Sequence, residues 1–223
     1  MLCRQCGQEL SPQDRFCNLC GTPVAVPRKK ARLWPAVVTL VLIFAVGLSV
    51  FLLMRPDRAA TPPAVSDEAA PWFTLENGVL YFDKNRYTGG SELTVPKSIN
   101  GQIVTALAEE CFAYCDALVM IYLPETLTSI GDSAFYGCSS LRGIRLPDRL
   151  LSIGDYAFGG CINLEAVCIP YSLRQFGESI YSNCHKLVYF FYPGPLSHWH
   201  RLSMGEIPDN SFVYCADGIY PAK

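Results

Sequence analysis

A period of 23 residues constrains the fold of this chain more than any other feature of its sequence. Residues 127–147 read LTSIGDSAFYGCSSLRGIRLP, and residues 150–170 read LLSIGDYAFGGCINLEAVCIP. The same register holds for four cysteines, namely Cys115, Cys138, Cys161 and Cys184. A fixed period of about 20–29 residues is typical of a solenoid, in which each unit is too small to bury its apolar face alone. We therefore expect stacked coils that share one core.

Alignment on the cysteines predicts four coils, each with a short strand in a parallel ladder. Because side chains alternate along a strand, Ile144 and Leu146 should point into the core and Arg145 away from it. Residues 98–107, SINGQIVTAL, contain an insertion that lengthens the first coil. The expected coils are 95–122, 123–145, 146–168 and 169–191.

The conserved register of glycine and aromatic residues predicts the rest of each coil. Gly131, Gly154 and Gly177 are expected to mark a turn. The Asp-x-Ala-Phe that follows the first two is expected to insert its aromatic ring from a short helical turn.

The repeated cysteines are expected to be free, buried thiols. Stacked positions keep neighbouring Cβ atoms near the strand spacing of about 4.8 Å, which exceeds the mean of about 3.8 Å in disulfides. A thiol then acts as a compact apolar side chain, where serine would leave its hydroxyl unsatisfied and leucine would be too large. A redox-active or metal-binding ladder is the alternative.

This pattern resembles leucine-rich repeats of the bacterial surface antigen (BspA-like) class, whose units read I-P-x-x-(V/L)-x-x-I-G-x-x-A-F-x-x-C-x-x-L. The likeness runs from about Phe73 to the C-terminus. YTGGSELTVPKSINGQIVTAL looks like the opening segment of that family, and PGPLSHWHRLSMG looks like its closing cap with a tryptophan. The resemblance implies an N-terminal cap at 72–94, four repeats at 95–191 and a C-terminal cap at 192–223. It also implies a surface, adhesion or interaction protein.

The outward strand positions predict a binding surface on the concave face of the solenoid. These positions are rich in aromatic side chains and include one arginine, a composition that suits binding. A face covered by a cap or by a second copy of the chain is the alternative. The candidate residues are Met120, Tyr122, Arg145, Cys168, Tyr189 and Phe191.

The first 24 residues carry a second, different set of cysteines. Cys3, Cys6, Cys17 and Cys20 form C-x2-C-x10-C-x2-C. Two tight turns then present four thiolates, which is the tetrahedral donor set of structural Zn(II). The segment resembles bacterial zinc-ribbon domains. Disulfides, or iron as in rubredoxin-like sites, are the alternatives.

Residues 33–54, LWPAVVTLVLIFAVGLSVFLLM, contain no charged residue. As a helix they would extend about 33 Å, enough to cross a hydrocarbon core of about 30 Å. A cleaved signal peptide fits less well, because the apolar run is long and 32 residues precede it. A buried core helix also fits less well, since no other part of the chain could surround it. The segment predicts one transmembrane helix.

Flanking charge predicts the orientation of that helix. The basic juxtamembrane segment 25–32 carries four Lys or Arg residues, against two, Arg55 and Arg58, just after the span. Excess positive charge marks the cytoplasmic side. We therefore expect a single-pass protein of the plasma membrane with a cytoplasmic N-terminus and extracellular repeats. Residues 55–71, rich in Pro and Ala, are expected to be an extended linker.

Neither nucleic-acid binding nor catalysis is indicated. Residues 73–223 carry ten basic and fifteen acidic residues, a net charge of −5, so this part offers no basic surface for nucleic acid. His198 and His200 lie in the expected cap, where solvated surface histidines are favoured over a weak metal site. No P-loop, G-x-S-x-G or kinase motif is present. The chain is interpreted as a non-enzyme.

The leading hypothesis is a membrane-anchored, outward-facing leucine-rich-repeat interaction module with a structural zinc ribbon in the cytosol. Its expected partners are the lipid bilayer and an extracellular protein, peptide or glycan, with self-association also open. The alternative is a single-pass sensor that couples an extracellular ligand to a cytosolic partner through the zinc ribbon.

Overall fold

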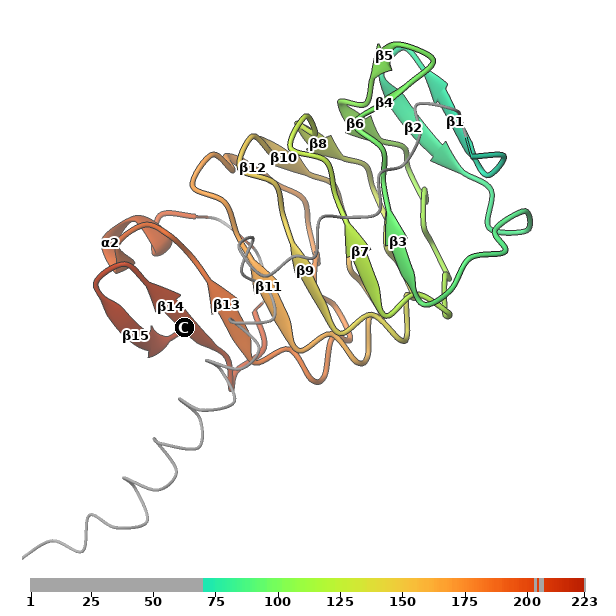
Figure 1. Ribbon diagram of the computed structural model, residues 1–223. Coiled ribbons are helices and arrows are strands. Elements are labelled where there is room, and N and C mark those ends of the chain that lie inside the picture. Colours follow the sequence, from blue (N-terminus) through green and yellow to red (C-terminus); the bar gives the residue numbers. More distant parts are fainter. Residues whose placement is uncertain (1–69, 203, 205–206, 223) are drawn as a thin grey trace, which may run out of the picture. The chain divides into compact units, whose positions relative to one another are not determined.

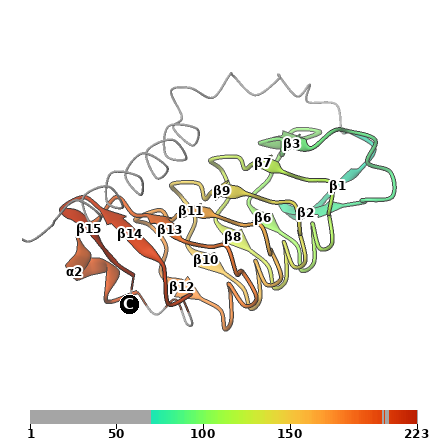
Figure 2. The ribbon, with the colours of Figure 1, turned by 90° about the horizontal axis from the view of Figure 1, so that it is seen from below.

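The computed structural model describes residues 70–202, 204 and 207–222 (Figure 1). Within this part the chain winds through successive coils. Each central coil gives one strand to each of two sheets. Figure 2 shows these two sheets on opposite sides of the coils.

The first sheet, called the ladder sheet below, has seven strands in the order β3-β7-β9-β11-β13-β14-β15. Neighbouring strands pair in parallel at the expected register, with Val167 between Ile144 and Phe190. Its strands are β3 (Glu92–Thr94), β7 (Met120–Tyr122), β9 (Gly143–Arg145), β11 (Ala166–Cys168), β13 (Tyr189–Phe191), β14 (Phe212–Cys215) and β15 (Gly218–Pro221). The expected parallel ladder is present, and it continues through β3 on one side and β14 on the other.

The second sheet was not expected from the sequence. Its strands are β1 (Phe73–Glu76), β2 (Val79–Phe82), β6 (Ala106–Leu107), β8 (Ser129–Ile130), β10 (Ser152–Ile153) and β12 (Gln175–Phe176), paired in that order. β1 and β2 form a hairpin whose turn residues, Asn77 and Gly78, have φ values of 51° and 83°. From β2 onward the pairing is parallel.

The Ala-Phe segment of each coil is a series of turns, so the expectation of a short helical turn is wrong. Backbone N–H groups bond to the next coil: Phe112 N to Ala134 O at 2.7 Å, and Phe135 N to Ala157 O at 2.8 Å. Left-handed backbone at two places in each coil accompanies this pattern. Those residues are Glu110, Ser133, Tyr156 and Ser179, then Tyr114, Gly137, Gly160 and Asn183.

Two smaller elements lie outside the sheets. The insertion in SINGQIVTAL forms a hairpin of β4 (Ser98–Ile99) and β5 (Gln102–Ile103), whose turn residues have positive φ, as favoured for Asn-Gly. Helix α2 (Leu196–Trp199) lies in the C-terminal segment. Trp199 is 2% exposed and donates from Nε1 to the carbonyl of Ala222 at 3.3 Å. The tryptophan of the closing segment is therefore a core residue.

The core is a column of aromatic rings, one from each coil. Phe135 stacks on Phe112 and on Phe158, with centroid distances of 5.3 and 5.1 Å. Tyr181 continues the column at 5.9 Å from Phe158. These rings are buried together with the inward side chains of both sheets. Apolar burial on this scale is the main stabilising term of a repeat fold, in which each coil completes its neighbour.

The repeated cysteines are free and buried, as expected. Each of three thiols also donates a hydrogen bond to the aromatic residue of the preceding coil. Cys138 Sγ lies 3.0 Å from the Phe112 carbonyl, and Cys161 Sγ lies 3.1 Å from the Phe135 carbonyl. Cys184 makes the equivalent contact at 3.0 Å. The cysteines therefore link successive coils as well as filling space.

Candidate binding surface

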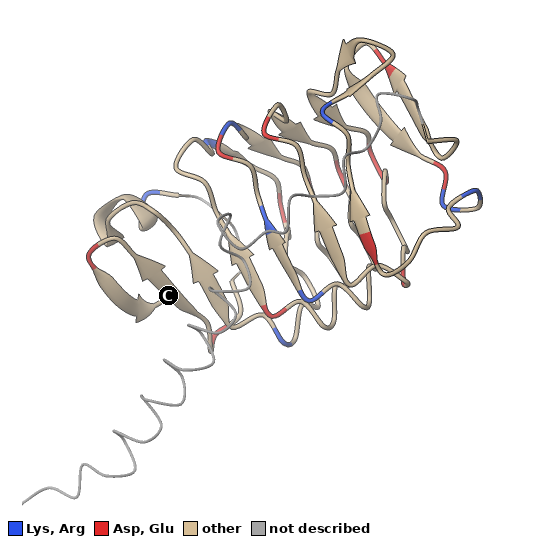
Figure 3. Cartoon of the chain, viewed as in Figure 1, with Lys and Arg blue, Asp and Glu red and all other residues tan. Residues whose placement is uncertain are grey.

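The outward side chains of the ladder sheet form two rows along the coils. Because the strands pair in register, Tyr122, Arg145 and Cys168 occupy equivalent positions in successive strands. Figure 3 shows charged residues mainly in turns, with few on this sheet. Within its strands Glu92 and Arg145 are the charged residues. The face is thus mostly aromatic and aliphatic.

The half of this face near β3 is accessible. Tyr122 is 36% exposed, and its hydroxyl donates to Glu92 Oε2 at 3.4 Å. Burial, followed by the negative charge of Glu92, raises the pKa of Tyr122. Arg145 lies in an ion pair with Asp148, with a distance of 3.5 Å between Nη2 and Oδ2. Met120 is half-buried in the same strand as Tyr122.

The half of this face near β14 is more enclosed. Phe191, expected as an accessible binding residue, is 6% exposed. The ladder continues into β14, which places the ring of Tyr214 5.0 Å from that of Phe191 and 6.1 Å from that of Tyr189. Cys168 is half-buried, and burial raises the pKa of its thiol to about 11, partly offset by Arg145. The sheet brings all six candidate residues together, but Phe191 is part of the packing.

A pocket that the sequence did not indicate lies at the β3 end of the ladder sheet. It encloses about 270 Å³. Its walls include the rings of Trp72, Tyr87 and Tyr122 together with Glu92. Trp72 and Tyr87 meet edge to face at a centroid distance of 5.4 Å. Both belong to the N-terminal cap, which has no repeat register that could have predicted their position.

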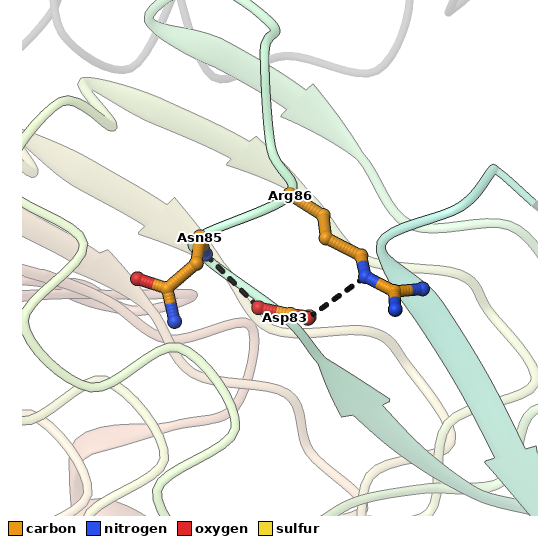
Figure 4. Close-up of polar contacts among 3 residues, drawn as sticks. All are labelled: Asp83, Asn85 and Arg86. Carbon is orange, nitrogen blue, oxygen red and sulfur yellow. Dashed lines mark hydrogen bonds and ion pairs between the residues drawn. The ribbon is translucent and has the colours of Figure 1, made fainter.

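A turn after β2 holds Tyr87 in this pocket (Figure 4). The carboxylate of Asp83 accepts from the backbone N–H of Asn85 at 3.0 Å and forms an ion pair with Arg86 at 3.3 Å. The hydroxyl of Tyr87 then donates to the carbonyls of Gly90 and Glu92 at 3.0 and 3.1 Å. These bonds fix the ring beside the outer edge of β3.

The two cap histidines lie on or just after helix α2, not on a strand. The ring of His198 stacks on Tyr171 at 4.6 Å, and its Nδ1 contacts the hydroxyl of Tyr192. Burial lowers the pKa of His198 and raises that of Tyr192 to about 12. His200 is exposed. In the described part of the chain, no group of three or more His, Cys, Asp or Glu residues is arranged to hold a metal ion.

Two sequence predictions concern residues outside the described part. These are the metal ligands Cys3, Cys6, Cys17 and Cys20, and the transmembrane segment 33–54. From residue 70 onward, no described helix combines the length and apolarity needed to cross a bilayer.

Three solved structures illustrate what the chain is similar to. A leucine-rich-repeat protein of T. pallidum is 25% identical, with 56% of this chain and 71% of that protein covered and a TM-score of 0.44. For one from Bacteroides ovatus the values are 22%, 56%, 36% and 0.44. For a leucine-rich cell surface protein of Faecalibacterium prausnitzii they are 24%, 62%, 44% and 0.43. The chain thus spans less than half of the last two proteins.

Two family matches cover different parts of the chain. No curated protein matches it. Residues 2–24 match a zinc-ribbon domain, in agreement with the spacing of the four N-terminal cysteines. Residues 105–216, half of the 223 residues, match the family described as "BspA type Leucine rich repeat region (6 copies)". With the parallel ladder and the 23-residue coils, this match shows that the chain belongs to the BspA-type leucine-rich-repeat family.

Proposed function

We propose that this protein is a membrane-anchored interaction module that binds an extracellular polypeptide on its ladder sheet. The observation that carries the proposal is the accessible half of that sheet. Its inward neighbours, such as Ile121 and Ile144, are buried, so the core is complete without the outward side chains. Tyr122, Arg145 and Glu92 therefore carry exposed aromatic and charged groups that folding does not require. Such residues are those that binding surfaces use.

The size of the ladder supports a small partner segment. Six parallel strands at a spacing of about 4.8 Å extend about 24 Å. A standard protein interface buries about 800 Å² on each partner, a patch nearer 30 Å across. The ladder sheet thus suits an extended peptide or a loop of a larger protein better than a broad surface. Side-by-side copies on a membrane would enlarge it.

The N-terminal part supplies the anchor and a cytosolic domain in this proposal. The uncharged segment 33–54 would cross the bilayer, and the basic residues before it would stay in the cytosol. Cys3, Cys6, Cys17 and Cys20 would hold one structural zinc ion. Four thiolates in two C-x2-C pairs fit Zn(II) and leave no coordination position for a substrate. The proposed module is therefore not an enzyme.

One labelling experiment on intact cells tests both the orientation and the face. Arg145→Cys and, as a control on a turn, Glu109→Cys are each treated with a membrane-impermeant maleimide that carries a photoreactive group. Both should take up the label from outside, above the background of half-buried Cys168 and Cys215 in the unsubstituted chain. After illumination, only Arg145→Cys should give a discrete crosslinked adduct. Labelling only after permeabilisation, or equal adducts from both positions, would overturn the proposal.

A further inference from the structure

The pocket at the β3 end of the ladder sheet has walls that suit one particular chemistry. Trp72, Tyr87 and Tyr122 supply aromatic faces, and Gly89 and Gly90 leave one side without side chains. At about 270 Å³ it falls below the range of about 300–1,000 Å³ usual for drug-sized ligands. It can hold a single side chain, but not an oligosaccharide.

Glu92 is the charged residue of this lining. Within the described part of the chain, no ion pair joins it to a lysine or arginine. Arg86, the basic residue nearest in sequence, is engaged with Asp83. The only hydrogen-bond donor given for the Glu92 carboxylate is the hydroxyl of Tyr122, at the long distance of 3.4 Å. The pocket therefore has a negative charge that lacks a cation in the described structure.

Trp72 adds a second unmatched group. Its indole Nε1 is buried and has no hydrogen-bond partner among the described residues. Leaving a buried donor unpaired costs free energy, so native proteins rarely keep one without a reason. This N–H needs an acceptor, and a peptide carbonyl is the acceptor that an approaching backbone would bring.

We propose that this pocket binds the side chain of a lysine or arginine in a partner polypeptide. The inference rests on the proposed function and names the chemistry of its ligand. The cation would lie against the aromatic faces of Trp72 and Tyr122, where the ring quadrupole attracts positive charge, and would pair with Glu92. The backbone carbonyl beside that residue would accept from Trp72 Nε1. The excess of acidic over basic residues in 73–223 favours the approach of a basic segment.

Titration of the full chain in detergent, followed by NMR of its indole N–H groups, tests this assignment. The chain has three tryptophans, and Trp72→Phe identifies the signal of Trp72 by its loss. The probes are the capped tripeptide Ac-Ala-Lys-Ala-NH₂ and the same peptide with norleucine, which keeps the alkyl stem without the charge. The lysine peptide should shift the Trp72 signal saturably and bind about tenfold more tightly than the norleucine peptide.

Two glutamate variants and a sugar complete the test. Glu92→Gln should remove the preference for lysine, whereas Glu109→Gln, an exposed glutamate on a turn, should keep it. Equal binding of the two peptides, no shift with either, or a shift with methyl glucoside in place of the lysine peptide would overturn the pocket assignment. Each of these leaves the crosslinking result at Arg145 unaffected, so the wider binding function and the pocket can fail separately.

Discussion

At the scale of single residues, the repeated cysteine both fills space and donates a hydrogen bond. Cys161 is fully buried, and its thiol reaches the Phe135 carbonyl, which also accepts from the backbone N–H of Cys138 at 3.2 Å. The expectation that a serine would be unsatisfied is wrong, because this carbonyl would accept from a hydroxyl as well. Cysteine adds a larger, more apolar side chain whose weak donor costs little to bury.

Removal of this side chain should therefore destabilise the stack of coils. Cys161→Ala loses both the buried sulfur and its hydrogen bond, and we expect the free energy of unfolding to fall by about 1–3 kcal/mol. Ile162→Ala, at a neighbouring position that is 46% exposed, should change it by less than about 0.5 kcal/mol. Urea unfolding of the full chain measures both. Equal stability of the two variants would contradict the packing role of the cysteine.

At the scale of elements, a column of glycines sets how closely the coils approach. A Cβ atom on Gly177 would lie 2.3 Å from the carbonyl carbon of Gly154, and one on Gly131 would lie 2.7 Å from that of Ala108. The sequence indicated a turn at these positions. The structural reason for glycine is instead the closeness of one backbone to the next, since neither glycine has a positive φ.

Gly177→Ala should push two coils apart. The nearest atoms belong to backbone, which cannot move aside as a flexible side chain can. We expect a loss of about 1–3 kcal/mol in the free energy of unfolding. Gly90→Ala is the matched control, because nothing lies within 4 Å of the Cβ position there. Thermal unfolding of both variants would show the difference, and an unchanged midpoint for Gly177→Ala would disprove this explanation.

The elements also show how far the sequence could predict the fold. The ladder strands follow from the period and from the alternation of Ile144, Arg145 and Leu146. The second sheet escaped prediction because strands of two residues, such as Ser152–Ile153, are too short to show alternation. The enclosure of Phe191 escaped it because residues after 191 leave the cysteine register, which hides β14.

The candidate pocket could not be predicted for a related reason. Trp72 and Tyr87 lie in the cap, where no repeat relates them to the ladder strands. Their approach to Glu92 and Tyr122 depends on the β1–β2 hairpin and the turn at Asp83. Contacts of this kind are set by tertiary packing, and local sequence patterns do not report them.

At the scale of the described solenoid, the aromatic column needs a cover at each end. The ring of Phe82, from the β1–β2 hairpin, lies 4.9 Å from that of Phe112. At the other end, Phe190 lies 5.5 Å from both Tyr181 and Trp199. Terminal caps of this kind are what a repeat protein requires, because its last coils have no further neighbour to bury their apolar side.

The chain's eleven cysteines form two chemically different sets. Seven lie in the part that the structure describes, and five of these are buried. Burial raises the pKa of Cys111 and of Cys115 to about 12. A thiol with so high a pKa stays protonated near neutral pH and is a poor metal ligand. The four N-terminal cysteines are therefore expected to account for the metal affinity of the whole protein.

This division predicts the metal content of the purified chain. The unsubstituted protein should hold about one zinc ion, measured by atomic absorption after removal of loosely bound metal. Cys17→Ser removes one of four thiolate ligands and should abolish that zinc, because a short ribbon without its metal has too small a core to stay folded. Cys161→Ala should keep the zinc despite its lower stability. Zinc lost from Cys161→Ala but retained by Cys17→Ser would place the metal in the repeats and contradict the assignment of the ribbon.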